Sequence, residues 1–172
     1  NPKKEQGKNG YDKTTESARV GYYSVTKNDG VKVELTCTQR VAFHQYTFPE
    51  SGAQVLVDLQ HGLRFVFDPS AAKGLVIESS VKIENDHTIS GYCSTDNWVK
   101  RKYFFTLTFD QPFISSKELL KKDNEKAPRF LLDFQLADSK VLKVKIALSS
   151  VDVAGAQQNM EAELNHWDFN RV

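Results

Sequence analysis

The sequence has almost no net charge of either sign, because 23 Lys and Arg residues are balanced by 22 Asp and Glu residues. A near-neutral chain lacks the electrostatic field that attracts the phosphates of nucleic acids or an anionic membrane surface. No apolar run approaches the roughly 20 residues that a transmembrane helix needs. These two deficits argue against a nucleic-acid partner and against a helical membrane span.

Cysteine is also scarce, and Cys37 and Cys93 are the only two in the chain. Two cysteines alone cannot supply a closed structural zinc site, which usually takes four Cys or His ligands. They could pair as one disulfide, or they could be two separate thiols buried in strands. The count leaves both alternatives open, and with them the redox compartment.

Motifs for catalysis or metal binding are missing as well. None of the four histidines stands in a two-histidine motif such as HExxH, and the sequence has no GxSxG elbow and no glycine-rich phosphate loop. Glu161 and Glu163 lie two residues apart in a helical segment, so they face different sides and make a poor pair for glycoside hydrolysis. We therefore predict no catalytic residue and no metal ligand within this chain.

What the sequence does have is alternation of apolar and polar residues, as in strands with one buried face. Turn residues such as Asn28-Asp29-Gly30 separate the alternating runs. About ten short strands without crossover helices predict a mainly β protein, an antiparallel β-sandwich over residues 20–150. The clearest runs are Val31 to Cys37, Tyr103 to Phe109, Phe130 to Leu136 and Leu142 to Leu148.

Three segments fall outside this pattern. Residues 1–19 are polar without periodicity, which predicts a mobile or linking segment. Ser115 to Asn124 has good helix formers and predicts a short surface helix. Residues 151–172 predict a closing helix capped by Asp152, whose apolar stripe would need a partner surface in a longer polypeptide. The stripe consists of Val153, Ala156, Met160, Leu164 and Trp167.

Trp98 is the best candidate for contact with a ligand. It follows Ser94-Thr95-Asp96-Asn97, so an indole lies beside hydroxyl, carboxylate and amide groups in an expected loop. Such a set suits a sugar, whose C–H faces stack on aromatic rings while its hydroxyls need polar partners. A tryptophan that only packs over the sandwich edge fits equally well, and Trp167 is assigned to packing.

Three blocks of the sequence, in order along the chain, carry distinctive motifs. Residues 21–49 contain a GYY segment, the strand ELTCTQR and the turn TFP. Residues 91–113 contain GYCSTDNW followed by YFFTLTFDQPF, and residues 149–172 carry the elements GAQQN, AE and WDF. Together these blocks resemble the N-terminal domain of glycoside hydrolase family 92, and the last block resembles the start of that family's linker helix.

The resemblance implies the β-sandwich of a calcium-dependent, inverting exo-α-mannosidase that is secreted or periplasmic. In that family an (α/α)6 catalytic domain holds the acid, the base and the main calcium ligands, so none of them is carried onto this sequence. The family's sandwich also begins earlier than Asn1. We therefore expect a fragment that is inactive alone, with α-mannoside glycans and the missing catalytic domain as partners and calcium bound only in the intact enzyme.

The matched motifs also imply roles for single residues. Glu16, Ser94 and Trp98 are expected to shape the sugar subsite at the interface between the two domains. Cys93 stands where the family has Arg and Cys37 where a small residue is usual, which could mean a disulfide. Arg40 and His44 are expected to tie strands or the domain interface together. The alternatives are a carbohydrate-binding module without catalysis and a purely structural sandwich; linkage preference and oligomeric state stay open.

Overall fold

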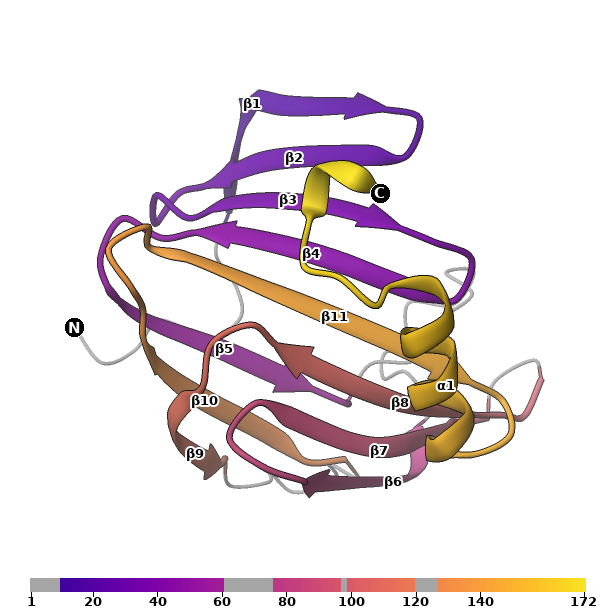
Figure 1. The fold of residues 1–172 in the computed structure, drawn as a ribbon. Helices are drawn as coiled ribbons and strands as arrows, with labels where there is room; N and C mark the ends of the chain where they lie inside the picture. The colour runs from indigo at the N-terminus through magenta and orange to yellow at the C-terminus, as the bar shows by residue number, and fades with distance from the viewer. Residues whose placement is uncertain (1–9, 61–75, 97–98, 120–126) are drawn as a thin grey trace, which may run out of the picture.

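The computed structural model describes residues 10–60, 76–96, 99–119 and 127–172, which form two antiparallel sheets and one α-helix (Figure 1). The larger sheet has the strand order β1-β2-β3-β4-β11-β8-β7-β6, and the smaller one β5-β10-β9. The strands are β1 (Tyr11–Arg19), β2 (Tyr22–Lys27), β3 (Lys32–Cys37), β4 (Val41–Thr47), β5 (Gly52–Asp58), β6 (Val76–Ile83), β7 (Thr88–Thr95), β8 (Arg101–Phe109), β9 (Phe113–Glu118), β10 (Arg129–Gln135) and β11 (Val141–Ser149).

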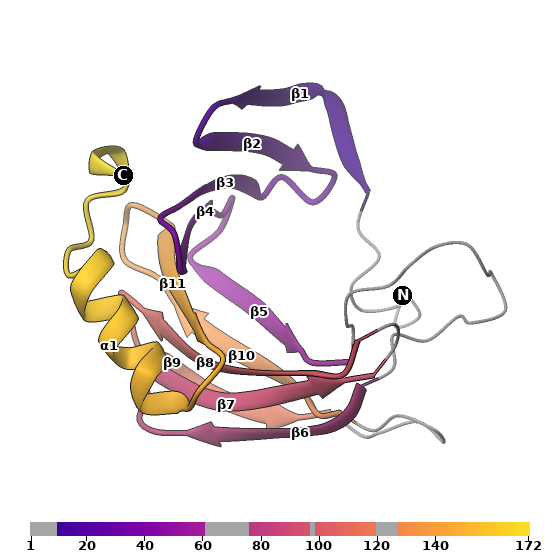
Figure 2. The ribbon, with the colours of Figure 1, turned by 90° about the vertical axis from the view of Figure 1, so that its right-hand side faces the viewer.

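The two sheets pack face to face, which confirms the predicted antiparallel sandwich. The larger sheet curves from β1 to β6, with the helix on its outer side (Figure 2). The alternating residues of β8, β10 and β11 supply most of the core between the sheets, as their period of two predicted. These core residues include Phe105, Leu107, Phe109, Leu132, Phe134, Leu142 and Val144.

The hairpin between β2 and β3 also follows the sequence prediction. Gly30 has φ of 86°, in the region that favours glycine, and its amide donates to the Lys27 carbonyl over 2.9 Å. The Asp29 carboxylate accepts from the Val31 amide over 3.2 Å. Turn chemistry that is local in sequence was therefore enough to place this connection.

The expectation of a mobile segment over residues 1–19 is wrong for Tyr11–Arg19. These nine residues form β1, which pairs antiparallel with β2, with a register shift between Asp12 and Ser17. All nine are exposed. A strand can add to a sheet edge through its backbone alone, so the polar sequence gave no signal of pairing. Residues 1–9 lie outside the described residues.

The helix expected from Ser115 is also wrong. Residues up to Glu118 belong to β9, in which Ser115 pairs with Asp133 and Lys117 with Leu131 of β10. Pairing with β10 outweighs the modest helix preference of a short polar segment. Residues 120–124 of the expected helix lie outside the described residues.

The closing helix α1 spans Val153–Glu163 and begins where the sequence predicted. The Asp152 side chain caps it by accepting from the Gly155 amide over 2.6 Å. The helix ends before Trp167, which lies in the turn that leads to a short 3-10 helix, η1 (Phe169–Arg171). The predicted start is thus confirmed, whereas the helix ends at Glu163 and not at the predicted residue 172.

The apolar stripe of α1 does not await an outside partner, contrary to expectation. The helix packs on the outer face of the larger sheet, against β11, β8 and β4. A second core forms there from Val41, Phe43, Ala147, Ala156, Leu164 and Phe169. The helix is therefore a layer of this domain and not merely a linker.

Two lysines of β11 hold the carboxyl end of α1 on the sheet. Lys145 is only 5% exposed; its Nζ donates to the Leu164 carbonyl over 3.0 Å and lies 3.9 Å from the centre of the Trp167 ring. Lys143 donates to the Trp167 carbonyl over 2.8 Å. Cations at a helix carboxyl end complement its dipole. Burial lowers the pKa of Lys145, and the packing role predicted for Trp167 is confirmed by its edge contact with Phe43.

Candidate functional site

Of the two residues of the expected loop that were assigned to sugar contact, Ser94 is the one within the described ranges. It lies within β7, opposite Glu78 of β6 and Lys102 of β8, so the strand continues through Thr95 where a loop was expected. The Ser94 side chain is only 3% exposed. Trp98 lies outside the described residues. The role of both residues in sugar binding stays a prediction.

Glu16 is far from Ser94 along the larger sheet. It lies in β1 and accepts a hydrogen bond from the Tyr23 hydroxyl over 2.8 Å. Strand β1 is six steps from β7 in the sheet order, a path of about 29 Å at the usual strand spacing. The structure therefore does not bring Glu16 and Ser94 together in one subsite.

The two cysteines are both free. Cys37 ends β3 and Cys93 lies in β7, four steps away in the sheet order, whereas a disulfide needs Cα atoms within about 7 Å. Burial raises the pKa of Cys93, so this thiol keeps its proton at neutral pH. The disulfide that the resemblance suggested is therefore not formed.

Arg40 connects a turn of the larger sheet to α1, whereas it was expected to tie strands or the domain interface together. It lies in the turn between β3 and β4, and its backbone amide and Nε both donate to the Glu163 carboxylate of α1. The Thr38 hydroxyl donates to the same carboxylate over 2.6 Å. The hydrogen bond from Thr38, and then those from Arg40, lower the pKa of Glu163 to about 2. Glu163 is thus a structural anion that locks the helix to the turn.

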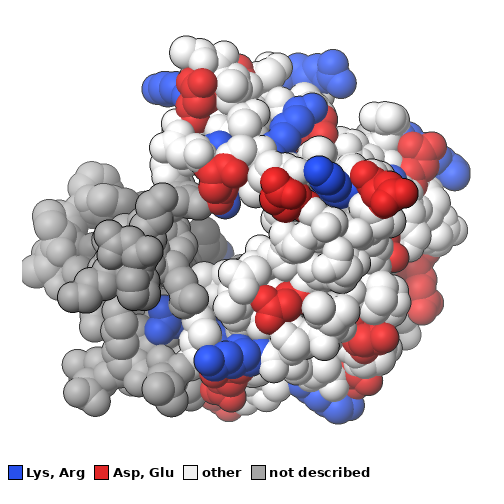
Figure 3. All heavy atoms as spheres, turned by 90° about the vertical axis from the view of Figure 1, so that its left-hand side faces the viewer, with Lys and Arg blue, Asp and Glu red and all other residues white. Residues whose placement is uncertain are grey.

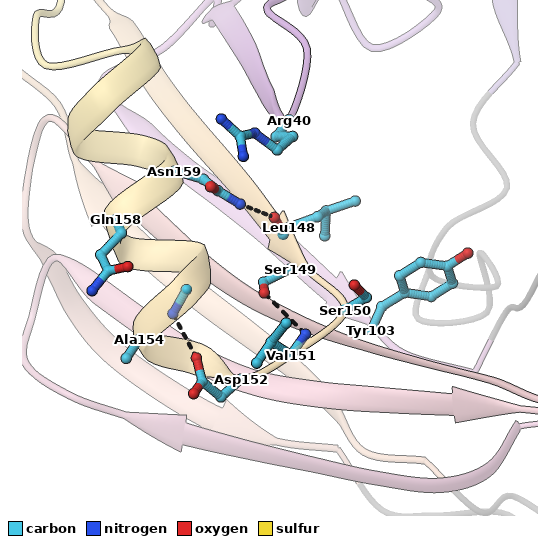
Figure 4. Close-up of a pocket in the computed structure, with 11 residues that line it drawn as sticks. Arg40, Tyr103, Leu148, Ser149, Ser150, Val151, Asp152, Ala154, Gln158 and Asn159 are labelled. Carbon is cyan, nitrogen blue, oxygen red and sulfur yellow. Dashed lines mark hydrogen bonds between the residues drawn. The ribbon is translucent and has the colours of Figure 1, made fainter.

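A hollow of about 570 Å³ opens where the chain turns from β11 into α1, and we call it the corner hollow (Figure 4). Its wall is formed by the end of β11, the first two turns of α1, Arg40 and Tyr103 of β8. Sequence reasoning missed this site because Arg40 and Tyr103 are distant in sequence from the β11–α1 junction. The only local signal was the polar pair Ser149-Ser150 before the helix cap.

Local hydrogen bonds fix the wall of the corner hollow. The Ser149 hydroxyl accepts from the Val151 amide over 3.1 Å, and the Asn159 side-chain amide donates to the Leu148 carbonyl over 2.8 Å. Gly155 lets the helix approach the strand, because a Cβ there would lie 2.7 Å from the Ser149 hydroxyl. The junction is therefore closely packed and hydrogen-bonded on its inner side.

The corner hollow combines polar groups with exposed apolar side chains. Leu148 and Val151 are 46% and 76% exposed. Asp152 is the only carboxylate in the wall, and it is the cap of α1. Glycoside hydrolysis needs two carboxyl groups on either side of the bond that breaks. The hollow is therefore suited to binding and not to acid–base catalysis.

A second hollow of about 350 Å³ lies between the two sheets and is largely apolar. His44 and Tyr46 of β4 face it, and the His44 Nδ1 is 2.7 Å from the Tyr46 hydroxyl. Burial lowers the pKa of His44 and raises the pKa of Tyr46 to about 12. At neutral pH the tyrosine therefore donates to an uncharged histidine. This pair ties neighbouring positions of one strand and is itself uncharged, while Asp58 of β5 brings a carboxylate to the lining.

Charge and metal ligands are dispersed over the part of the chain that the structure describes. On the face in Figure 3, acidic and basic side chains are intermixed without a large area of one sign. Within the described ranges, no group of three or more His, Cys, Asp or Glu residues could hold a metal ion. Nor does any described helix have the length and apolar character needed to cross a membrane.

Comparison with known proteins relates the whole sandwich to one family. A family model, the glycosyl hydrolase family 92 N-terminal domain, matches residues 1–149. The chain is similar to the solved family 92 alpha-mannosidase of Bacteroides thetaiotaomicron, with 25% identity and a TM-score of 0.77 over 94% of this chain and 23% of that one. A complex of that enzyme with mannoimidazole gives 26% identity and a TM-score of 0.78, over 93% and 22% of the two chains.

An inverting family 92 mannosidase of the same organism shares the fold, with 21% identity and a TM-score of 0.74 over 94% of this chain and 22% of that one. No curated protein sequence matches the chain. In each of these structures the chain spans less than a quarter of the similar protein.

Proposed function

Because the chain belongs to the family of glycosyl hydrolase family 92 N-terminal domains, which its residues 1–149 match, we propose that it is the β-sandwich part of an exo-acting α-mannosidase. That match over most of the chain is the observation that carries the proposal. The similar solved structures are alpha-mannosidases, and one of them was solved with mannoimidazole bound. The proposed substrate class is therefore an α-mannoside, and the proposed location is outside the cytoplasm.

In this proposal, the catalytic residues lie in the part of the enzyme outside this chain. An inverting glycosidase needs an acid and a base held roughly 6.5 to 9.5 Å apart around the sugar and a water molecule. Among the described carboxylates considered above, Glu163 is held by Arg40 and Thr38, and Asp152 caps α1. The acid, the base and the calcium ligands would thus come from outside this chain, where calcium would help to distort the mannose ring.

The contribution of this chain would be to shape the sugar site where the two domains meet. Ser94 and Trp98 remain the residues proposed for that role, and Ser94 lies near the end of β7, just before the connection to β8. Glu16 would contact a different part of the substrate or of the partner domain, because six strand steps separate β1 from β7. Binding pockets commonly lie between domains.

A carbohydrate-binding module without catalysis is the second candidate function. It is favoured by one observation, the packing of α1 on the domain's own sheet. A domain that covers its own closing helix needs no second domain to bury that apolar stripe. Such a module would bind sugars through its surface hollows and leave cleavage to other proteins.

The test is release of mannose from an α-linked mannobiose in the presence of calcium. We expect no release by this chain alone, and release by the longer polypeptide that contains it, lost when a chelator removes calcium. Sustained turnover by the chain alone would place acid and base within these residues and overturn the proposal. A longer polypeptide that cleaves α-glucosides but not α-mannosides would refute the proposed substrate class.

A further inference from the structure

We propose that the corner hollow binds a neutral sugar ring and serves as an outer glycan contact of the enzyme. The inference rests on the proposed function, since it adds a second sugar contact to the one proposed at Ser94. Strand β8 alone separates β11 from β7, so the two places are about 10 Å apart along the sheet. A single glycan could therefore reach both.

The size of the corner hollow fits a small ligand. Its volume of about 570 Å³ lies within the range of about 300–1,000 Å³ that is usual for ligand pockets. It is an open hollow on the surface, so a bound sugar would keep part of its surface in water. An open site of this kind predicts weak binding, with a Kd of about 1–10 mM.

The charges in the wall favour an uncharged ligand. Arg40 carries the only positive charge, and its Nε is paired with Glu163. The only carboxylate, Asp152, already accepts from the Gly155 amide. The wall thus carries one positive and one negative charge, so the hollow has no net charge with which to select an anionic or a cationic ligand.

The remaining groups match the two-sided chemistry of a pyranose. Leu148 and Val151 offer exposed apolar surface for its C–H face. Ser150 and Gln158 are exposed, and within the described ranges neither side chain has a hydrogen-bond partner, so both can pair with sugar hydroxyls. In Figure 4 the Leu148 and Val151 side chains lie beside the serine pair, between α1 and Tyr103.

The backbone around these groups is held in place by hydrogen bonds that do not need a ligand. The Ser149, Asp152 and Asn159 side chains are all engaged with backbone groups of the junction. A site whose frame is already fixed loses less conformational freedom when it binds, which makes even a few contacts sufficient for measurable affinity.

The test is an NMR titration of the isotope-labelled chain with methyl α-D-mannopyranoside and with an α-linked mannobiose. We expect saturable shifts of the Ser150, Val151 and Gly155 amides. The double variant Ser150→Ala/Gln158→Ala should weaken binding by about 3–10-fold, as expected for lost hydrogen bonds. Gln157→Ala, which changes the same residue type outside the corner hollow, should leave the affinity unchanged.

Three results would overturn the inference. Saturable shifts confined to the β7–β8 end would leave the proposed function intact and remove the corner hollow from it. No saturable shift up to 50 mM sugar would indicate a surface for another protein domain, while mannose release by the longer polypeptide would still decide the proposed function separately. Tighter binding of a glucuronide than of the neutral sugar would refute the assignment to neutral ligands.

Discussion

The contact between Glu163 and the β3–β4 turn offers the sharpest test of how α1 is held. The carboxylate accepts from the Thr38 hydroxyl, the Arg40 amide and the Arg40 Nε. In Glu163→Gln the amide oxygen can still accept from two of these donors, but its NH2 group then faces the third. Hydrogen bonds to a charged group are stronger than neutral ones, and Arg40 is half-exposed and can turn to water. We therefore expect a loss of about 1–2 kcal/mol in the free energy of unfolding.

The assay is urea and thermal unfolding of the wild-type chain and the variant at several pH values. For a chain of this length the loss corresponds to about 3–6 °C in Tm. The folded-state pKa of Glu163 is lowered from 4.5 to about 2. The carboxylate therefore contributes fully above pH 4.5, and its contribution is lost as the pH falls towards 2. The difference between wild type and variant should be complete at pH 7 and smaller at pH 3.

Glu161→Gln is the matched control, because it removes the same charge from an exposed position of the same helix. We expect it to change stability by less than about 0.5 kcal/mol. If both variants lost the same stability, or if the effect of Glu163→Gln did not depend on pH, the lock between the helix and the turn would be refuted.

Two further substitutions test the packing of the sheets and the helix. Lys145→Met keeps an unbranched apolar side chain, but it leaves the Leu164 carbonyl without its donor and removes the cation from the Trp167 ring. We expect the free energy of unfolding in urea to fall by about 1–3 kcal/mol. An unchanged unfolding midpoint would contradict the role of this lysine. Gly91→Ala places a Cβ 2.0 Å from the Ser80 carbonyl oxygen, so we expect a loss of about 3 kcal/mol. Its control is Gly52→Ala, where a Cβ meets nothing within 4 Å; equal melting temperatures for the two alanine variants would argue against the close approach of β6 and β7.

The packing of α1 changes how the end of the chain is viewed. A stripe of apolar residues at the end of a sandwich suggested a linker that waits for another domain. In the structure Ala156 and Leu164 are buried against the sheet, and Lys145 donates to the Leu164 carbonyl. The helix thus completes this domain and at the same time forms one wall of the corner hollow.

The accuracy of the sequence prediction depended on whether a signal was local. Period-two alternation placed β8, β10 and β11, and turn chemistry placed the hairpin at Gly30. Asp152 marked the start of α1. Each of these signals lies within a few residues of the structure it specifies, because strand period, turn and cap are properties of the local backbone.

The elements whose conformation depends on pairing with a segment distant in the sequence were decided by the tertiary structure. β1 is a strand because β2 offers it an open edge, and β9 is a strand because β10 pairs with it. The corner hollow exists because Arg40 and Tyr103 meet the β11–α1 junction. Sequence alone thus determined the mainly β sandwich and its closing helix, whereas edge pairing, the covered face of α1 and the hollow beside it come from contacts between segments far apart in the chain, which a local pattern cannot encode.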